Sequence, residues 1–357
     1  MGRITTDDLA RYLNLSRSTV SKALNDHPSV AESTKRAVLK AAYQFGYMDY
    51  PTLEEIRKGE GGSGANGVIG VLMTTEMVKN RFWNVALDGM EDHLLQHGYS
   101  IKKLLMDDRR ATHLHGLRIP YDVDGIVVLA SRTRQLYKQL LSYGKPMVTV
   151  DTSADTRGNN LLCDVVMMNN TSCTYEIAAH MIRSGRKNIA FVGDKFDSLS
   201  VWERWQGYQQ ALQEYGTIVR AFDSLLRIPL KGETKAQVSR AFSEIGMLPD
   251  ACICANDVVA VAVYQTLAKM GMSVPKDVMI SGFDSFDAAP LARSISMSLT
   301  SVAFDIREMG RQTARQMLYR LESPKAPYGV YSVESKVVYR SSTEVDIDRM
   351  IMNKKYL

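Results

Sequence analysis

The polar side chains of one short segment near the amino terminus are of the types that read nucleic acids. In the string LSRSTVSKALN (15–25), Val20, Ala23 and Leu24 share one face of a helix predicted over 17–24. The opposite face is polar and basic. Arg and Lys donate hydrogen bonds to guanine O6 and N7 in the major groove, and Ser can serve several bases. The candidate base-reading residues are Arg17, Ser18, Ser21 and Lys22, and we add Asn25 at the end of the helix to the DNA-binding set.

Hydroxyl groups near helix starts suit contacts to phosphates, which fix the register of a protein on DNA without reading its sequence. Ser16 caps the predicted helix and Thr19 lies in its first turn. Thr5 begins a T-x-x-D motif with Asp8, the signature of a cap for a preceding helix that runs to about Tyr12. Each hydroxyl alone would be read as solvated surface, and it is their order along the chain that favours a shared role in DNA binding.

The elements that must hold these side chains form a helix-turn-helix unit, which we call the headpiece. Leu9, Tyr12 and Leu13 have the spacing of a core-facing stripe, and Asn14 tolerates a left-handed turn before the second helix. A third helix is predicted over 31–45, and two helices at a tight turn braced by a third are typical of this motif. The inward positions expected on the third helix are Val38, Leu39, Ala42 and Phe45.

The charge balance permits a nucleic-acid partner without requiring one. The 357 residues carry 44 Lys and Arg against 39 Asp and Glu, a net charge of +5. Residues 1–50 hold seven basic and five acidic side chains, a net charge of +2. One copy of the headpiece is therefore weakly attracted to DNA, and tight binding would need two copies.

Beyond the headpiece the composition shifts. The string EGGSGANG (60–67) has a flexible-linker composition. After it, short apolar runs alternate with helical patterns, which is typical of βαβ units and of parallel sheets buried on both faces. Two such series predict an α/β fold of two doubly wound parallel-sheet lobes, with ligands at the carboxyl ends of the strands. The predicted strands are VIGVLM (68–73), SIKKLL (100–105), DGIVVLA (124–130), PMVTVD (146–151), NIAFVGD (188–194), ACICA (251–255) and VMISGFD (278–284).

No motif of the sequence points to catalysis, a cofactor or a metal. Gly62, Gly64 and Gly67 match G-x-G-x-x-G, but they precede a strand, whereas a dinucleotide loop follows a strand and opens a helix. Walker, HExxH and G-x-S-x-G motifs are absent from the sequence. Cys252 and Cys254 fall in an apolar run without a nearby His, so we interpret them as buried free thiols rather than zinc ligands.

The sequence also predicts a protein that neither enters a membrane nor leaves the cell. Its apolar runs are well short of the ~20 residues that a spanning helix needs. The amino terminus carries Asp7 and Asp8 and has no apolar core, unlike a secretory signal. We therefore expect a reduced, cytoplasmic protein.

Taken in order, the motifs resemble those of the LacI (lactose-repressor-like) family of bacterial transcriptional regulators. The resemblance runs from Thr5 to about Thr343. It rests on the headpiece string continuing to QFGY, and on RFWNVALDGMEDHLLQHGYS, AAHMIRSGRKNIAFVGD, ERWQGYQQAL, CANDVVAVAVYQTLAKMGMSVPKDVMISGFDS and VVYRSST. It implies a periplasmic-binding-protein-like core that binds a small effector between its lobes, in dimers or tetramers that grip or release an operator.

The resemblance also implies how the chain divides. Residues 1–50 are the headpiece, 51–66 a hinge helix and Gly-rich linker, 67–343 the core, and 344–357 a carboxyl-terminal tail. Within the core we expect a first lobe of about 67–163 and 293–322 and a second lobe of about 164–292 and 323–343.

The effector-binding residues implied by the resemblance converge on the cleft. Arg204 of ERWQG occupies the position that usually grips the effector. Carboxylate and guanidinium groups beside aromatic faces suit sugar hydroxyls and apolar ring faces. Asp257 and Asp284 could instead cap helices, and Trp202 or Trp205 could belong to the lobe core. The other candidates are Phe82 and Trp83 after the first strand, Asn256 and Asp257 of CAND, and Asp284 of SGFDS.

The hinge departs from the family pattern, which has a short helix that inserts a leucine pair into the minor groove. Here the segment reads YPTLEEIRKGE, and Leu53 and Ile56 have the i, i+3 spacing of an apolar wedge. Glu54 and Glu55 would oppose the approach of phosphates. Packing of the hinge against a dimer mate remains the alternative.

These observations predict a non-enzymatic repressor of a carbohydrate-utilisation operon. Its partners would be a pseudo-palindromic operator, a second copy of the chain in a dimer or tetramer, and a sugar or sugar phosphate as effector. One alternative is a cytoplasmic sensor that acts mainly through a protein partner. The other is a regulator whose effector is a nucleobase or small acid.

Overall fold

The computed structural model describes parts of the headpiece and most of the core. The described residues are 5–25, 27, 29–31, 34–35, 37–38, 41–42, 67–106, 119–120, 122–129, 133–156, 161–216, 222, 225–230, 233–285 and 296–344. The predicted wedge residues Leu53 and Ile56, the linker glycines Gly62 and Gly64, and positions 345–357 of the tail lie outside them.

The headpiece helices begin and end as their capping residues predict. Helix α1 (Thr6–Leu13) has a capping box in which the Thr5 amide donates to Asp8 Oδ2 at 3.0 Å while Thr5 Oγ1 accepts from the Asp8 amide. It ends at Asn14, which is left-handed with φ 53°. Helix α2 (Arg17–Leu24) is capped by Ser16 Oγ, which accepts from the Thr19 amide at 3.0 Å.

The headpiece core confirms most of the predicted inward positions. Leu9, Val20 and Ala23 are buried, and so are Val38 and Ala42 at described helical positions of the third helix. Leu39 and Phe45 lie outside the described residues. The prediction for Tyr12 is wrong, because 48% of its surface is exposed. The buried stripe of α1 is centred on Leu9, Ala10 and Leu13, which leaves position 12 on its flank at 100° per residue.

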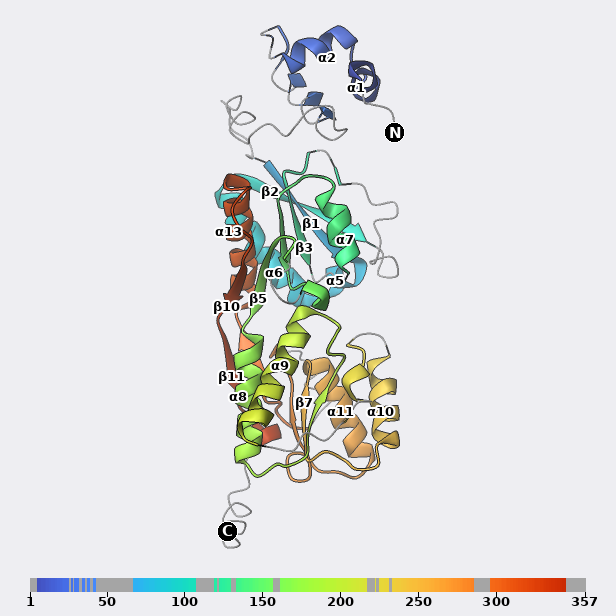
Figure 1. Cartoon of the computed structure of the whole chain (residues 1–357), viewed down its shortest axis with the longest axis vertical. Coiled ribbons are helices and arrows are strands. Elements are labelled where there is room, and N and C mark those ends of the chain that lie inside the picture. The colour runs from blue at the N-terminus through green and yellow to red at the C-terminus, as the bar shows by residue number, and fades with distance from the viewer. Residues whose placement is uncertain are drawn as a thin grey trace.

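The first lobe is built on a six-stranded, wholly parallel sheet (Figure 1). Its strands are ordered β10-β5-β4-β3-β1-β2, with the bounds β1 Gly67–Thr74, β2 Tyr99–Met106, β3 Gly125–Leu129, β4 Met147–Val150, β5 Asp164–Met168 and β10 Val330–Val333. Its helices are α5 Thr75–Lys79, α6 Arg81–Gln96, α7 Arg134–Leu141 and α13 Ile306–Glu322, with a short 3-10 turn, η2, at Ala154–Thr156.

Two glycines allow helices α6 and α13 to pack closely along the sheet. A Cβ added at Gly89 would meet the carbonyl oxygen of Arg307, and one added at Gly310 would meet that of Ala86. The two helix backbones therefore touch, which any larger residue would prevent. This contact fixes where the start of α6, with Phe82 and Trp83, lies relative to the sheet.

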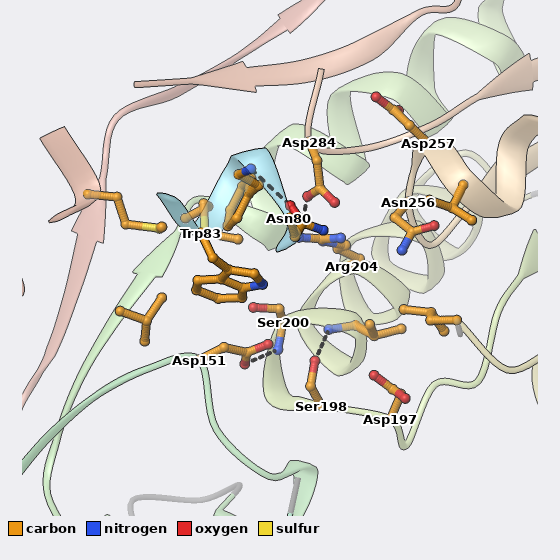
Figure 2. A pocket seen from close by; sticks show the side chains of 17 residues that line it. Asn80, Trp83, Asp151, Asp197, Ser198, Ser200, Arg204, Asn256, Asp257 and Asp284 are labelled. Carbon is orange, nitrogen blue, oxygen red and sulfur yellow. Dashed lines mark hydrogen bonds and ion pairs between the residues drawn. The ribbon is translucent and has the colours of Figure 1, made fainter. Parts of the chain in front are cut away.

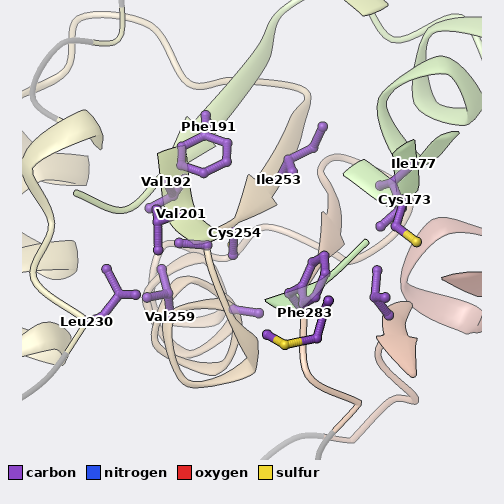
Figure 3. Packing of buried hydrophobic residues seen from close by; sticks show 14 of the residues in the cluster. Cys173, Ile177, Phe191, Val192, Val201, Leu230, Ile253, Cys254, Val259 and Phe283 are labelled. Atoms are coloured by element: carbon purple, nitrogen blue, oxygen red, sulfur yellow. The ribbon is translucent and has the colours of Figure 1, made fainter. Parts of the chain in front are cut away.

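The second lobe has a smaller parallel sheet in the order β6-β7-β8, with an antiparallel pair β9-β11 beside it. Its core packs the apolar faces of the strands against the helices, as Phe191, Ile253 and Val259 show (Figure 3). The strands are β6 Ile189–Val192, β7 Ala251–Cys254, β8 Met279–Ser281, β9 Ser301–Phe304 and β11 Ser335–Val338. The helices are α8 Asn170–Arg183, α9 Leu199–Glu214, α10 Thr234–Glu244 and α11 Asp257–Lys269, with 3-10 turns η3 Leu225–Arg227 and η4 Ser341–Thr343.

The boundaries between the lobes differ from those expected from the sequence. Strands β5 and β10 were assigned to the second lobe, yet they pair with β4 and with each other in the sheet of the first lobe. Strand β9 was assigned to the first lobe, yet it pairs with β11, and the adjacent Thr300 bridges to Ser281 of β8. The chain thus crosses between the lobes three times, directly after β5, β9 and β10. A strand's partners are distant in sequence, so an apolar run does not reveal which sheet it joins.

The predicted core strands and the predicted free thiols are confirmed. Each of the seven runs interpreted as strands contains a strand of one of the two main sheets. Cys252 and Cys254 lie on β7, and all four cysteines are buried and free. Among the described residues, no helix is long and apolar enough to cross a membrane, and no group of His, Cys, Asp and Glu has the arrangement of a metal site.

A buried ion pair fastens the edge of the first sheet. Arg320 Nε of α13 donates to Asp164 Oδ2 at the start of β5 at 2.7 Å, and both side chains are at most 2% exposed. The other carboxylate oxygen accepts from the Gly329 amide at 2.9 Å, and Arg320 Nη2 donates to the Pro327 carbonyl at 3.0 Å. Both members of the ion pair therefore also bind the segment that leads into β10, Arg320 at Pro327 and Asp164 at Gly329.

We expect Arg320→Met to lower the free energy of unfolding of the core by ~3–5 kcal/mol, because the Asp164 carboxylate would stay buried without its partner. Urea unfolding followed by tryptophan fluorescence measures the change. Arg240→Ala serves as the control, since it removes an exposed i, i+4 pair with Glu244 and should leave the midpoint unchanged. Equal midpoints for the two variants would show that the buried pair does not stabilise the core.

Candidate functional site

A pocket lies between the two lobes at the carboxyl ends of the first sheet's strands (Figure 2). Residues that end β4 and β5 meet those that begin helices α9 and α11. The pocket encloses about 1110 Å³ not filled by protein, including open solvent at its mouth. All the effector-binding residues predicted from the sequence line it together: Phe82, Trp83, Arg204, Asn256, Asp257 and Asp284.

Arg204 lies at the centre of the site and is held on every side. Its Nε donates to Asn170 Oδ1 at 2.9 Å, its Nη1 to the Ala255 carbonyl at 2.6 Å, and its Nη2 to Asp284 Oδ1 at 3.3 Å. Its guanidinium carbon lies 3.5 Å from the centre of the Phe283 ring. The side chain is 4% exposed, so one fixed orientation presents its edge to the pocket.

Asp284 lines the pocket and forms an ion pair with the Arg204 guanidinium. Its backbone has φ 98°, and Ser285 follows with φ 37°, a left-handed pair of non-glycine residues that stores backbone strain. Burial raises the pKa of the Asp284 carboxyl above its ordinary value, and the neighbouring Arg204 guanidinium offsets part of the rise. The side chain is 28% exposed, which leaves it accessible to a ligand in the pocket.

Asn256 and Asp257 both have structural roles at the start of α11. Asn256 Oδ1 accepts from the Val259 amide at 2.9 Å and is the N-cap of the helix. Asp257, in the first turn, accepts from the Ser301 hydroxyl at 2.7 Å through Oδ1. The helix-capping role that Asp257 could have had is therefore filled by its neighbour Asn256, while Asp257 complements the helix dipole. The residues that Asp284 could have capped, 286–295, lie outside the described residues.

The aromatic pair comes from the first lobe. Asn80 Oδ1 accepts from the Phe82 amide at 2.9 Å and starts helix α6, which carries Phe82 and Trp83 to the pocket. Their ring centres lie 4.9 Å apart at 80°, an edge-to-face contact. The Trp83 ring faces Arg204 across the pocket (Figure 2).

Neither Trp202 nor Trp205 lines the pocket. Trp202 packs against Val165, Met167 and Leu199, and Trp205 packs against the main core. The lobe-core alternative therefore describes the placement of Trp205, whereas Trp202 packs in a separate cluster with β5 of the first lobe.

Sequence reasoning missed Asp151 and Ser200, which both line the pocket. Asp151, after β4 in the first lobe, accepts from the Ser200 amide at 3.1 Å and so caps helix α9 of the second lobe. The Leu199 amide likewise donates across the lobes to the Thr152 carbonyl at 2.8 Å. Signals for both residues were present, since Asp151 closes a predicted strand and Ser200 precedes Arg204 by one helical turn.

The Ser200 hydroxyl differs from the other polar groups of the pocket. The residue is 3% exposed, and its Oγ has no hydrogen-bond partner within the protein. Figure 2 shows its side chain on the pocket side of α9, toward Trp83. A buried hydroxyl without a partner costs free energy that a bound polar ligand would recover.

In the headpiece, the predicted base-reading face is exposed. Arg17 Nε lies 3.6 Å from Asp7 Oδ1 with 71% of the arginine side chain exposed. Ser18, Ser21 and Lys22 are also exposed, as is Asn25, whose amide donates to the Ser21 carbonyl at 2.8 Å. The hydroxyls predicted to contact phosphates also serve the caps: Thr5 donates to Asp8 Oδ2, and Ser16 Oγ shares hydrogen bonds with the hydroxyls of Ser18 and Thr19.

A helix-turn-helix headpiece joined to a two-lobed core with a ligand-sized cleft is the architecture of a regulator that couples a small molecule to DNA. Residues 5–49 match the family model described as bacterial regulatory proteins, lacI family, and residues 178–343 match the periplasmic binding protein-like domain. Together the two models match more than half of the chain. The chain belongs to the LacI family and is a DNA-binding transcriptional regulator, not an enzyme.

Relatives and solved structures match over nearly the whole chain. The transcriptional repressor PurR of Vibrio parahaemolyticus is 24% identical over 95% of this chain and 98% of its own length. The transcriptional regulator RegA of Clostridium saccharobutylicum is 26% identical over 94% and 98%.

Among solved structures, a transcriptional regulator CelR–cellobiose complex has a TM-score of 0.65 at 22% identity, covering 95% of this chain and 100% of that one. The lac repressor dimer bound to operator and the anti-inducer ONPF has a TM-score of 0.61 at 19% identity, covering 96% and 99%. At these identities the structural likeness shows a shared fold.

We expect Asn256→Ala to lower the free energy of unfolding by ~1 kcal/mol, because the first turn of α11 would lose its side-chain acceptor. Asn256→Ser keeps an acceptor at the cap and should retain most of that stability. Urea unfolding of the three proteins without ligand makes the comparison. A serine variant as unstable as the alanine variant would argue against the cap as the source of the effect.

Proposed function

We propose that this regulator represses a carbohydrate-utilisation operon and that a sugar bound in the cleft controls its affinity for operator DNA. The observation that carries the proposal is the pocket itself, where Arg204 and Asp284 of one lobe face Trp83 of the other. Such groups hydrogen bond to sugar hydroxyls while an aromatic face covers the apolar C–H face of the ring. Two solved structures of the same fold have titles that name a bound sugar, cellobiose in one and ribose in the other.

The two lobes supply a means of control. A ligand that contacts both Trp83 and Arg204 is bound best at one angle between the lobes, and it therefore shifts the population toward that angle. The chain crosses between the lobes three times, so a change of angle moves the whole first lobe, from whose first strand the linker and headpiece lead off. In a twofold dimer this motion would change the spacing of the two headpieces and so the affinity for a pseudo-palindromic operator.

Arg204→Ala should abolish the response to the effector and leave operator binding in place, because it removes the guanidinium from the cleft and nothing from the headpiece. Fluorescence anisotropy with the regulator's own upstream DNA, titrated with a panel of neutral sugars that includes ribose and cellobiose, measures both properties. Arg240→Ala removes an exposed arginine on α10 and should respond like the wild type. A response that survives in Arg204→Ala would place the effector elsewhere.

Arg17→Ala should weaken binding to the operator by about 5- to 150-fold, the range for losing one bidentate base contact. Binding to random DNA of the same length should weaken much less, since phosphate contacts dominate there. An equal loss on both DNAs would show that Arg17 contacts phosphates and does not read bases.

A salt titration distinguishes this function from a sensor that acts through a protein partner. If the headpiece binds DNA, the logarithm of the binding constant should fall steeply and linearly with the logarithm of salt concentration. A shallow slope, with equal affinity for operator and random DNA, would favour the protein-partner alternative.

A further inference from the structure

We propose that the cleft accepts an uncharged, polyhydroxylated ligand and excludes phosphorylated and carboxylated ones. This inference rests on the proposed function and narrows the class of effector from sugars and sugar phosphates to neutral sugars. It depends on the charges that line the cleft, on the protein groups that already accept hydrogen bonds from its donors, and on the buried Ser200 hydroxyl, which has no partner among the described residues.

The described lining of the cleft is strongly acidic. Among the described residues that line it, Arg204 is the single cation, with no Lys or His beside it. Four aspartates contribute to the same lining: Asp151, Asp197, Asp257 and Asp284. A phosphate would enter against these charges, and in a partly desolvated site like charges repel far more strongly than in water.

Arg204 offers little to an incoming anion. Its three nitrogens already donate to Asn170, to the Ala255 carbonyl and to Asp284. An oxyanion that approached Nη2 would have to share it with the Asp284 carboxylate, 3.3 Å away. Three of the five N–H groups of the guanidinium are therefore used within the protein, and a phosphate bound to the remaining ones would lie beside the Asp284 carboxylate.

The second lobe brings two helix N-termini to the cleft, and such termini are the usual anion sites of α/β proteins. At α9, the Leu199 amide donates to the Thr152 carbonyl, the Ser200 amide to Asp151, and the Val201 amide to Ser198 Oγ. The N-terminus of α9 is thus already occupied by protein acceptors, one of them a carboxylate.

At α11, the Val259 amide donates to Asn256 Oδ1, and the Asp257 amide donates to the Phe283 carbonyl. Asp257 itself adds a negative charge to the first turn. Both of these helix ends of the second lobe therefore carry a carboxylate of the protein.

The groups that remain suit a neutral hydroxyl. Ser200 Oγ is buried, unpartnered and directed toward Trp83, and a hydroxyl can donate to a ligand oxygen or accept from a ligand hydroxyl. Carboxylate oxygens accept hydrogen bonds and donate none. A sugar hydroxyl both donates and accepts, so it can satisfy Ser200 and a carboxylate together, whereas an ionised phosphate only accepts.

Matched ligand pairs test the charge preference directly. The full-length protein is titrated, by thermal shift and by operator release, with ribose against ribose 5-phosphate, glucose against glucose 6-phosphate and glucuronate, and cellobiose against cellobionate. We expect at least one neutral member to bind and its charged partner to bind about 100-fold more weakly, the order expected for like charges in such a site. A charged member that binds as tightly as its neutral parent would overturn the inference.

A variant of one lining charge tests whether phosphorylated ligands are excluded by charge repulsion or because their shape does not fit the cleft. Asp197→Asn should lower the ratio of the affinities for neutral and phosphorylated ligands several-fold, because it removes one negative charge from the lining. Asp194→Asn removes a negative charge outside the lining, at a carboxylate that accepts a hydrogen bond from the Phe196 amide. It should leave the ratio of affinities unchanged. Equal effects of the two variants, or none from Asp197→Asn, would contradict the assignment.

The outcomes also distinguish this inference from the function on which it rests. Operator release by a phosphorylated sugar, lost in Arg204→Ala, would keep the cleft as the effector site and overturn the exclusion of anions. If no sugar of either charge altered the melting temperature or operator binding, the proposed sugar response would fail, and the inference with it.

Discussion

The buried guanidinium of Arg204 connects the segments that follow the three strands in the main sheet of the second lobe. Its own helix follows β6, its Nη1 bonds the Ala255 carbonyl after β7, and its Nη2 bonds Asp284 after β8. Its Nε bonds Asn170, the first residue of α8, the helix that follows the crossing from β5 into the second lobe. Because leaving a buried guanidinium without acceptors is costly, these four segments must stay in register with one another. The ligand-facing edge of the lobe is therefore set by one side chain.

Asn170 extends this constraint toward the crossover. Its amide donates to the Met168 carbonyl at 3.1 Å and to Glu203 Oε2 at 2.9 Å, while its oxygen accepts from Arg204. Burial raises the pKa of Glu203, and the Asn170 amide offsets part of that rise. Asn170 is 1% exposed, so its three bonds leave it no freedom to rotate alone. A ligand that shifts Arg204 thus acts on a residue at the point where the lobes are joined, and Asp151 makes the reciprocal contact from the first lobe to α9.

Local features of the sequence predicted the local features of the structure. Thr5, Asp8, Asn14 and Ser16 fix the ends of the headpiece helices through contacts within a few residues, and such contacts can be read from spacing alone. The alternation of apolar runs and helices likewise predicted two α/β lobes.

What depends on distant partners was not predictable. The sheet that β5 and β10 join is decided by pairing with β4 and by the Arg320–Asp164 contact, whose members are 156 residues apart. The pocket likewise combines features that the sequence predicts with features that depend on distant partners. The resemblance placed Arg204 and Asp284 there, but the unpartnered state of Ser200 Oγ depends on the packing of both lobes.

The two binding surfaces of the molecule use charge in opposite ways. In the headpiece, Arg17 and Lys22 are exposed and face outward, where phosphates and base edges can reach them, and Asp7 beside Arg17 moderates that charge. In the cleft, carboxylates are directed at amides and at one arginine, so helix ends that would otherwise attract anions are already occupied. The net charge of +5 is the sum of these unlike regions and describes neither. The proposed functions thus require a mildly basic chain to bind a polyanion at one end, where a dimer would double the contacts, and to exclude small anions from its core.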